Sequence, residues 1–177
     1  MSSHHIVREN QEPALVVWDP VRYEDLAEFL EWSPLVIVTE QSMELVLSWG
    51  IRIDVVLGAH DGAFSGQEAP YFAPPGPDTV QTLIDLLSAR QCDAVVVFGE
   101  ESLLSTLQNA PWHIHISVVT TAWRWVRISA DFHKWFPAGS VWRTFGRSME
   151  PGEEVVSTRD GMIEFDAKSI LWVGEKR

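Results

Sequence analysis

The sequence contains very little cysteine and comparatively little positive charge. Cys92 is the only cysteine among the 177 residues, so no disulfide can form within the chain. Lys and Arg together number 13, whereas Asp and Glu number 25, which gives a formal net charge of −12. A charge of this sign repels nucleic acid and anionic membrane surfaces, so we expect neither as a partner.

Long apolar segments and the common catalytic signatures are also missing. No apolar run approaches the roughly 20 residues that span a bilayer, and the opening stretch MSSHHIVREN lacks the apolar region of a signal peptide. We therefore expect a cytoplasmic protein. The absence of Gly-x-x-x-x-Gly-Lys, Gly-x-Gly-x-x-Gly and Gly-x-Ser-x-Gly excludes the familiar P-loop, dinucleotide and hydrolase sites.

What the chain does contain, from Ala14 to about Thr120, is an alternation of short apolar runs with helical patterns. Such alternation is typical of a mostly parallel sheet covered by helices. The expected strands are Ala14–Trp18, Leu35–Val38, Asp54–Gly58, Ala94–Phe98 and Ile114–Val119. We expect Asp19 to cap the first helix with Pro20 at its first position, and Asp78 to cap a later helix.

After Thr120 the hydrophobic period changes from that of helices to that of strands. The runs WRWVRI, SVWRTF, EEVVST, GMIEF and SILWVG alternate every second residue and are separated by turn signals such as PAGS and RDG. The predicted fold class is therefore α/β. It comprises a mostly parallel, Rossmann-like sheet with helices over residues 1–120, followed by a small antiparallel β domain over residues 121–177.

Three carboxylates stand where expected strands end or helices begin: Glu40, Asp61 and Asp78. Ligands of open α/β sheets bind at that edge, so these groups could hold a divalent cation that clamps nucleotide phosphates, with His60 beside them. Local chemistry offers another explanation for each. Glu40 suits the first turn of a helix, Asp61 suits a turn, Asp78 suits an N-cap, and His60 could simply be solvated.

Tryptophan and histidine supply two further candidate sites. Trp123 and Trp125 share one face of an expected strand and could form a stacking wall for a flat heterocycle, or could equally belong to a core or a subunit interface. His113 and His115 have a spacing that can hold zinc. No third ligand lies nearby in the sequence, however, and alternation on a half-exposed strand explains the pair equally well.

The run EQSMELVLSWGIRIDVVLGAHDG, from Glu40 to Gly62, resembles the thiamine pyrophosphokinase family. That family has Asp-Gly-Gly after a strand, a helix ending in Gly-Ile, then Pro-Asp, an apolar strand and Gly-Asp-x-Asp-Ser. The spacing here is the same without a gap. The Gly-Ile pair, Asp54, the strand VVL, Gly58 and the second motif carboxylate, Asp61, are all present.

Other positions of the family pattern are changed. Glu40 replaces the first Asp, Gln41 and Ser42 replace the glycines, Ala59 replaces the first Asp of the metal motif, and Gly62 replaces its Ser. The stretch GPDTVQTLIDLL resembles the family's Lys-Asp-x-Thr-Asp motif, with Asp78 matching the final Asp. In AVVVFGEESLL only Gly99 matches Gly-Gly-Arg-x-Asp-His, although Glu100 or Glu101 could substitute in space for a missing carboxylate.

The resemblance implies a homodimer with a nucleotide-binding-like domain and a thiamine-binding-like β domain. It also implies pyrophosphoryl transfer from ATP to thiamine, with Mg²⁺ as cofactor. Loss of one preorganised electrostatic donor typically costs about 10²–10³ in rate, and this chain lacks several. Our hypothesis is a weak or inactive relative, a pseudoenzyme able to bind a small ligand. The alternative is an active, divergent Mg²⁺-dependent pyrophosphoryl transferase acting on thiamine or a related heterocycle.

Overall fold

A computed structural model describes residues 12–31, 33–58, 68–73, 78–128, 132–146, 151–168 and 170–177. The chain divides into two compact units. Unit 1 comprises Met1–Phe98 and Trp112–His115, and unit 2 comprises Gly99–Pro111 and Ile116–Arg177. The domain boundary that the sequence places between residues 120 and 121 stays a prediction.

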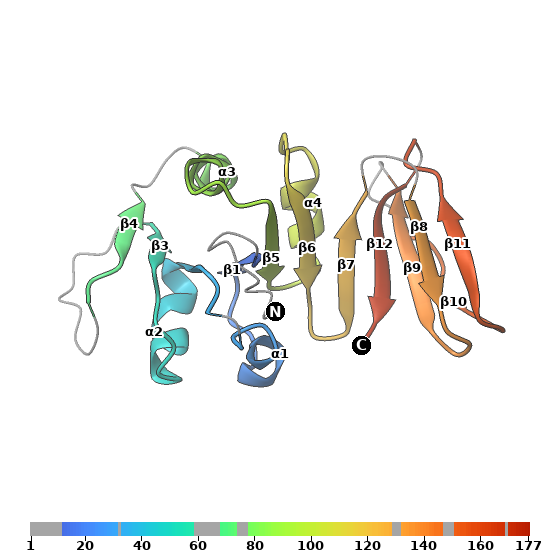
Figure 1. Ribbon diagram of the computed structural model, residues 1–177, viewed down its shortest axis with the longest axis horizontal. Helices are drawn as coiled ribbons and strands as arrows, with labels where there is room; N and C mark the ends of the chain where they lie inside the picture. Colours follow the sequence, from blue (N-terminus) through green and yellow to red (C-terminus); the bar gives the residue numbers. More distant parts are fainter. Residues whose placement is uncertain are drawn as a thin grey trace, which may run out of the picture. The chain divides into compact units, whose positions relative to one another are not determined.

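Five parallel strands form the sheet of unit 1 within the described residues (Figure 1). They are β1 (Ala14–Val17), β2 (Val36–Thr39), β3 (Val55–Leu57), β4 (Tyr71–Ala73) and β5 (Ala94–Phe98), in the order β5-β1-β2-β3-β4. The chain therefore moves outward from β1 to β4 and then returns to the other side of β1. The predicted α/β character of this part is confirmed.

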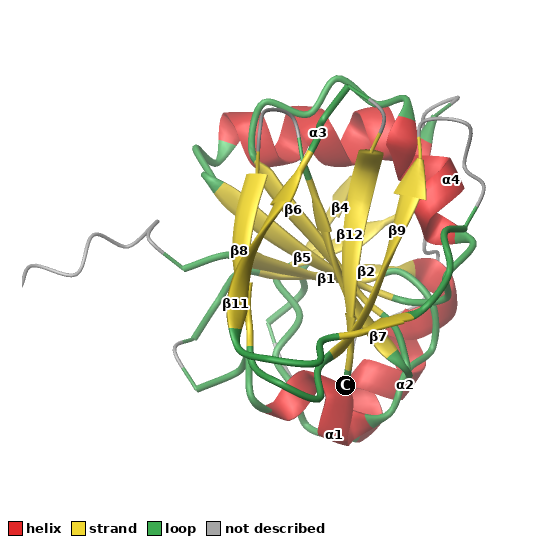
Figure 2. Cartoon of the chain, turned by 90° about the vertical axis from the view of Figure 1, so that its right-hand side faces the viewer, coloured by secondary structure: helices red, strands yellow, loops and turns green. Residues whose placement is uncertain are grey.

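Three helices cover this sheet: α1 (Tyr23–Ala27), α2 (Glu40–Ser48) and α3 (Thr79–Ala89). Figure 2 shows α3 on one side of the strands of unit 1 and α1 and α2 on the other. The apolar stripe predicted for α3 is buried as expected; its members are Val80, Leu83, Ile84 and Leu87. Gly50 follows α2 with a φ of 71°, the left-handed conformation expected of a glycine just beyond a helix.

The predicted start of the first helix was wrong. α1 begins at Tyr23, with Arg22 rather than Asp19 as its N-cap residue. The Nε and Nη2 atoms of Arg22 each donate to the buried carboxylate of Asp25 at 3.0 Å, which fixes the first turn at this position. The Asp19 carboxylate instead accepts a hydrogen bond from Gln41, so it is engaged at the end of β1.

Unit 2 is built mainly from antiparallel strands, as the sequence predicts. Its larger set has the order β10-β9-β12-β7-β6. These strands are β6 (His115–Val119, of which His115 belongs to unit 1), β7 (Trp123–Arg127), β9 (Val141–Gly146), β10 (Val155–Val156) and β12 (Ile170–Lys176). An antiparallel pair, β8 (Phe132–Phe136) and β11 (Gly161–Phe165), forms a separate two-stranded sheet. A short helix, α4 (Leu103–Gln108), completes the unit.

Two strands were not predicted. Neither β4 nor β8 is among the strands expected from the sequence. β4 has only three residues, of which Tyr71 is exposed, so its hydrophobic signal is weak. β8 alternates clearly between half-buried or buried residues and exposed ones. Its hydropathy does not follow that alternation, because Lys134 takes a half-buried position and Trp135 an exposed one.

One hydrophobic cluster of unit 2 combines side chains of the two-stranded sheet (Figure 2) with side chains from one face of the larger set of strands. Phe136 and Phe165 come from the two-stranded sheet, and Ile128 and Val173 come from the region of β7 and β12. The indole of Trp142 meets the Phe165 ring edge-on at a centroid distance of 5.4 Å. Aromatic packing of this kind supplies much of the buried area that a small β unit needs.

The opposite face of the same strands carries a layer of aromatic rings and one arginine. Trp125 on β7 and Arg143 on β9 both pair in register with Gly174 on β12, which lies between them. The guanidinium of Arg143 stands over the rings of Trp123 and Trp125, at 4.4 and 5.1 Å from their centroids. A Cβ atom at Gly174 would lie 2.5 Å from the Trp125 ring, so this layer requires glycine at the centre of the row.

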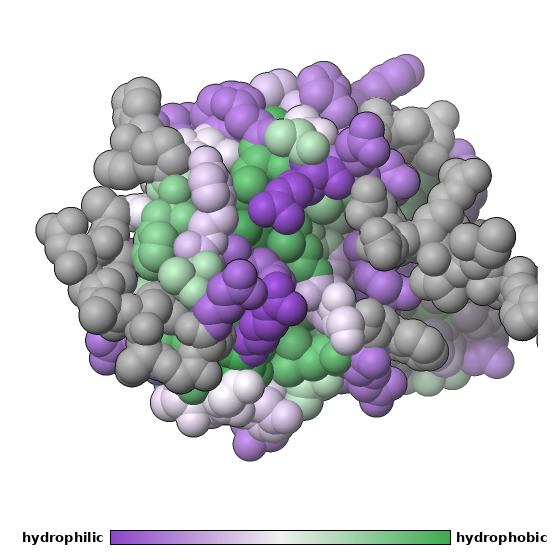
Figure 3. Space-filling view, turned by 60° about the vertical axis from the view of Figure 1, so that its left-hand side comes forward, coloured by the Kyte–Doolittle hydropathy of each residue, from purple (hydrophilic) through white to green (hydrophobic). Residues whose placement is uncertain are grey.

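The surface combines strong acidity with a few large exposed apolar side chains. Figure 3 shows one face, on which hydrophilic side chains border a hydrophobic area. The large apolar residues exposed in the described ranges are Tyr23, Tyr71, Trp135, Val155, Val156 and Met162. None of the helices in those ranges has the length and hydropathy that a transmembrane span requires.

Replacing Gly174 with alanine should lower the free energy of unfolding by about 1–3 kcal/mol, the usual cost of overpacking a filled core. The reason is the clash of the new methyl group with the Trp125 ring. Gly161→Ala is the matched control, because a Cβ atom there meets nothing within 4 Å. Urea denaturation of both variants measures the difference, and equal stabilities would contradict the packing described for this face.

Candidate functional site

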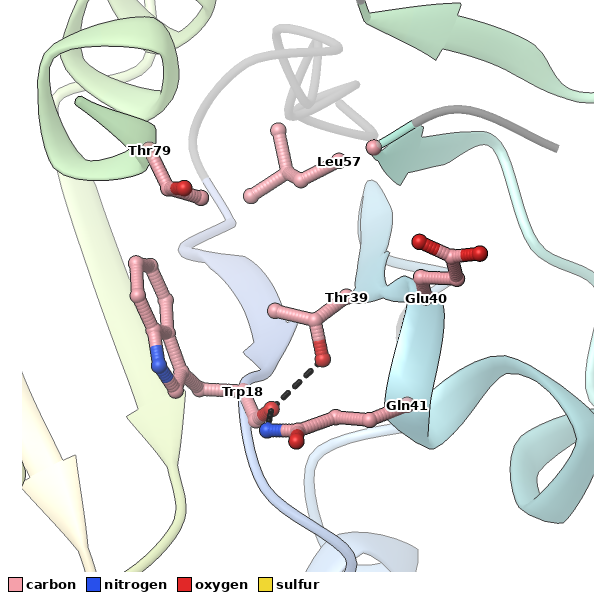
Figure 4. Close-up of a pocket in the computed structure, with 7 residues that line it drawn as sticks. Trp18, Thr39, Glu40, Gln41, Leu57 and Thr79 are labelled. Atoms are coloured by element: carbon pink, nitrogen blue, oxygen red, sulfur yellow. Dashed lines mark hydrogen bonds between the residues drawn. The ribbon is translucent and has the colours of Figure 1, made fainter. Parts of the chain in front are cut away.

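A pocket of about 540 Å³ opens at the carboxyl ends of the parallel strands of unit 1 (Figure 4). Its volume is in the range that small-molecule sites occupy. The described residues that line it are Trp18, Thr39, Glu40, Gln41, Leu57, Gly58 and Thr79. Ligands of open α/β sheets bind at this edge, and the order of strands reverses here at β1, so the pocket is the leading candidate site.

The strand ends place these side chains. Trp18 directly follows β1, and Leu57 is the last residue of β3. Thr39 ends β2 and Glu40 begins α2 without an intervening loop, so the side chain of Glu40 lies at the first turn of the helix. Gly58 follows β3 with a φ of 135°, a conformation that side chains disfavour, and a Cβ atom there would lie 3.4 Å from Oε2 of Glu40.

The main-chain carbonyl of Trp18 is the centre of a hydrogen-bond network. It accepts from the hydroxyl of Thr39 at 2.6 Å, from Nε2 of Gln41 at 2.9 Å and from the hydroxyl of Ser42 at 3.2 Å. Nε2 of Gln41 also donates to the Asp19 carboxylate at 3.0 Å. Gln41 and Ser42 stand where the resembled family has glycines, and their side chains tie the end of β1 to the start of α2.

Asp78 has the capping role that the sequence analysis offered as its local explanation. Its Oδ1 accepts from the backbone N–H of Val80 at 2.9 Å and from that of Gln81 at 3.3 Å. The Gln81 side chain does not return to complete a capping box and donates to Asp85 instead. Asp78 therefore neutralises the N-terminus of α3 beside Thr79, which lines the pocket.

The predicted cluster consists of Glu40, Asp61 and Asp78. The structure describes two of these carboxylates, Glu40 and Asp78. Glu40 lines the pocket, and Asp78 caps α3 next to it. Asp61 and His60 lie outside the described residues, so their part in a metal or phosphate site stays a prediction. Among the residues that the structure does describe, no group of three or more His, Cys, Asp or Glu side chains could hold a metal ion.

Trp123 and Trp125 share one strand face, with their ring centroids 5.6 Å apart. Both are buried in unit 2, and Arg143 already stacks over both rings, so ligand stacking at this pair stays a prediction. Arg143 also forms an ion pair with Glu101, so the Glu101 carboxylate is paired with a residue of its own unit, unit 2. His113 and His115 are exposed, and they form no metal-binding group within the described ranges.

Two other features fall short of a site. A cavity of about 330 Å³ lies near the amino end of β2, and the Asp54 carboxylate on its wall accepts from the N–H of Val36 at 2.9 Å and pairs with Arg52 at 3.3 Å. Its charged groups are thus already paired with each other. Burial raises the pKa of the Cys92 thiol, which keeps it protonated and argues against a role as a nucleophile.

Sequence reasoning missed Trp18, Thr39, Gln41 and Thr79 as pocket residues. A signal for the first two was present, because Trp18 ends the first apolar run and Thr39 directly follows the second. Side chains at the carboxyl ends of parallel strands are the ones that face a ligand crevice. An indole and a hydroxyl carry no charge, so neither stands out in the sequence as a carboxylate does.

Solved structures that include thiamine pyrophosphokinases superpose on more than nine-tenths of this chain. Thiamine pyrophosphokinase from Bacillus subtilis superposes with a TM-score of 0.52 at 11% identity, covering 92% of this chain and 98% of that one. The enzyme from Geobacillus thermodenitrificans gives 0.54 at 12% identity, covering 93% and 97%. A protein from Lactobacillus plantarum gives 0.60 at 12% identity, covering 93% and 98%. No family model matches the sequence, and no curated protein matches it.

The chain has the thiamine pyrophosphokinase fold. This confirms, at the level of the fold, the resemblance carried by the stretch from Glu40 to Gly62. Identities of 11–12% establish architecture and leave activity open. The fit extends over nearly the whole chain, including the β strands in which the sequence showed no transferable motif.

Replacing Asp78 with alanine should lower the free energy of unfolding by about 1 kcal/mol, because the first N–H groups of α3 lose their acceptor. Asp78→Asn should retain most of the stability, since asparagine is an equally good N-cap residue. Thermal and urea denaturation measure both variants. An alanine variant as stable as the unmodified protein would mean that the carboxylate is not needed as a cap and is available for a ligand.

Proposed function

We propose that this chain is a catalytically degenerate protein with the thiamine pyrophosphokinase fold, which binds a small ligand at the carboxyl edge of its parallel sheet and acts as a homodimer. The observation that carries the proposal is the network around the Trp18 carbonyl. Gln41 and Ser42 occupy the positions of the glycines in the family motif, and their side chains fill the space between the ends of β1 and β2.

Pyrophosphoryl transfer depends on close approach of the backbone to phosphates and on a positioned Mg²⁺ ion. Glycine permits such an approach because it has no side chain. Here a glutamine amide and a serine hydroxyl stand in that place, and a carboxylate, that of Asp78, already occupies the N-terminus of α3. These features support binding without turnover.

The alternative is an active, divergent transferase that uses ATP and Mg²⁺. The observation in its favour is Glu40, a carboxylate that lines the pocket at the position of the first motif Asp. Mg²⁺ is commonly held by one or two carboxylates together with substrate phosphates, so Glu40 with Asp61 would be the groups to hold it. The extra methylene of Glu relative to Asp could shift the ligand by about 1 Å, a misplacement that can cost about 10²-fold in rate.

With ATP, Mg²⁺ and thiamine, the purified protein should form no thiamine pyrophosphate above a reaction without protein. The physical reason is the loss of several groups that position phosphates, each worth about 10²–10³ in rate where one has been removed from an enzyme. The amount of thiamine pyrophosphate formed is measured by chromatography. Turnover that disappears in Asp61→Ala would overturn the proposal in favour of the transferase.

The homodimer is proposed from the family resemblance, and one surface feature supports it. Trp135 on β8 and Met162 on β11 face each other in register and are 57% and 61% exposed. Interface cores are enriched in tryptophan and methionine relative to the rest of a protein surface. We therefore propose a second copy of the chain as the partner that covers the outer face of this two-stranded sheet.

Sedimentation equilibrium at micromolar concentration should return twice the 20.0 kDa mass of the chain. Trp135→Asp should shift the distribution to the monomer, because a buried unpaired carboxylate opposes association. Tyr71→Asp is the control: Tyr71 is 54% exposed but lies in unit 1, so its replacement should leave the dimer intact. A monomeric unmodified protein would exclude the homodimer.

A further inference from the structure

We propose that His133 on β8 and Glu164 on β11 form one half of a Zn²⁺ site, and that a second copy of the chain supplies the same two residues to complete it. The inference rests on the proposed homodimer, because these residues lie on the face of the two-stranded sheet proposed as its interface. It adds the chemical class of an ion bound there and makes the association of the two copies depend on that ion.

His133 and Glu164 stand opposite each other on neighbouring strands and face solvent. They pair in register, as do Trp135 and Met162, which lie two residues away on the same face. Phe165, the residue after Glu164, is buried in the hydrophobic cluster, so the alternation of the strand directs Glu164 outward. The side chains of His133 and Glu164 are 52% and 71% exposed, and an ion can therefore reach both from solvent.

The separation of the two candidate ligand atoms suits chelation of one metal ion. Nε2 of His133 lies 3.6 Å from Oε1 of Glu164. In a tetrahedral zinc site with bonds of about 2.1 Å, neighbouring ligand atoms lie about 3.4 Å apart. The observed distance is longer than that of a hydrogen bond, so no such bond has to break before an ion enters between the two groups. A small movement of either side chain brings both atoms to bonding distance.

One copy of the chain supplies only half of a closed site, because structural zinc sites use four protein ligands and the pair provides two. The described residues of one chain contain no group of three or more His, Cys, Asp or Glu side chains that could hold a metal ion. In a twofold homodimer the same patch meets itself, so each ligand occurs twice. Two imidazoles and two carboxylates then surround a single ion, which gives the number and the kinds of ligand that zinc sites use.

The ion also removes an electrostatic obstacle to association. Each chain carries a net charge of −12, so two copies repel each other. Burial of the Glu164 carboxylate of each copy in the interface is costly without a compensating charge. The two positive charges of one Zn²⁺ ion balance these two carboxylates. Trp135 and Met162 on the same face exclude water around the site, and this strengthens the attraction between the ion and its ligands.

The kinds of ligand distinguish Zn²⁺ from other ions. Mg²⁺ and Ca²⁺ take six or more oxygen ligands, whereas an imidazole nitrogen together with a carboxylate oxygen is typical of Zn²⁺. An ordinary cross-strand ion pair is the other explanation for the proximity of His133 and Glu164. The two explanations differ in an observable way, because an ion pair needs no metal and leaves association insensitive to a chelator.

The test measures the dissociation constant of the homodimer by sedimentation velocity of the full-length protein, once with EDTA and once with Zn²⁺. We expect Zn²⁺ to lower this constant at least about tenfold, because an ion that binds only the dimer shifts the equilibrium by mass action. Co²⁺ in place of Zn²⁺ should produce the strong visible absorption of tetrahedral coordination. That signal reports the ligand geometry independently of the sedimentation result.

Two variants and two matched controls assign the ion to its ligands. The chain has six histidines, so an effect of Zn²⁺ alone does not identify the site. His133→Gln and Glu164→Gln should each abolish the tightening by Zn²⁺ and leave the dimer in EDTA intact. His115→Gln and Glu44→Gln, at exposed residues of unit 1, should retain the tightening.

Stoichiometry tests whether the site is shared between two copies. Calorimetric titration of the unmodified protein and of His133→Gln should differ by one Zn²⁺ ion for every two chains. His133 and Glu164 are exposed, so their replacement should not prevent folding, and circular dichroism verifies this for each variant.

The outcomes separate this inference from the homodimer on which it rests. Equal dissociation constants in EDTA and in Zn²⁺ would overturn the metal site and leave the homodimer standing. Tightening that persists in His133→Gln or in Glu164→Gln would place the ion elsewhere and would also overturn the inference. A difference of one ion for every chain would contradict the shared site. A monomer under both conditions would overturn both the inference and the homodimer.

Discussion

The carbonyl group at the end of β1 is the constraint on which the site depends. Main-chain carbonyls at the carboxyl ends of parallel strands have no partner in the next strand and must find one elsewhere. The Trp18 carbonyl finds it in side chains of the last residue of β2 and the first turn of α2, so the two strand ends and the start of α2 are held together. With that anchor in place, Glu40 and the indole of Trp18 occupy fixed places at the edge of the sheet.

Satisfying that carbonyl from the protein has a chemical consequence. A glycine-rich turn leaves its N–H groups free for phosphate oxygens, whereas the side chains of Gln41 and Ser42 turn their donors inward. At this edge of the sheet the exposed Glu40 carboxylate lies at the first turn of α2, whose N-cap residue, Thr39, makes no side-chain cap. The same fold can thus carry different side chains at the same edge, which is why fold alone does not assign function.

The sequence predicted β1, β2, β3 and β5 well because each contains a continuous buried apolar run, as the fully buried β5 run Val95–Phe98 illustrates, whereas it missed the short and partly exposed β4. It predicted the start of α1 poorly, because the ion pair between Arg22 and Asp25 and the use of Asp19 by Gln41 depend on contacts that a linear pattern does not contain. The family motif led to Glu40. The motif did not indicate Trp18, because an aromatic residue at the end of a strand is equally typical of a buried core.

The row that joins Trp125, Gly174 and Arg143 links three strands through a single shared volume. Because the indole occupies the space of the missing side chain, the two positions cannot vary independently. A larger residue at position 174 would be tolerated only with a smaller one at position 125, and the energies of the two changes would not add. Among natural variants of this chain, the residues at these two positions should therefore change together in size.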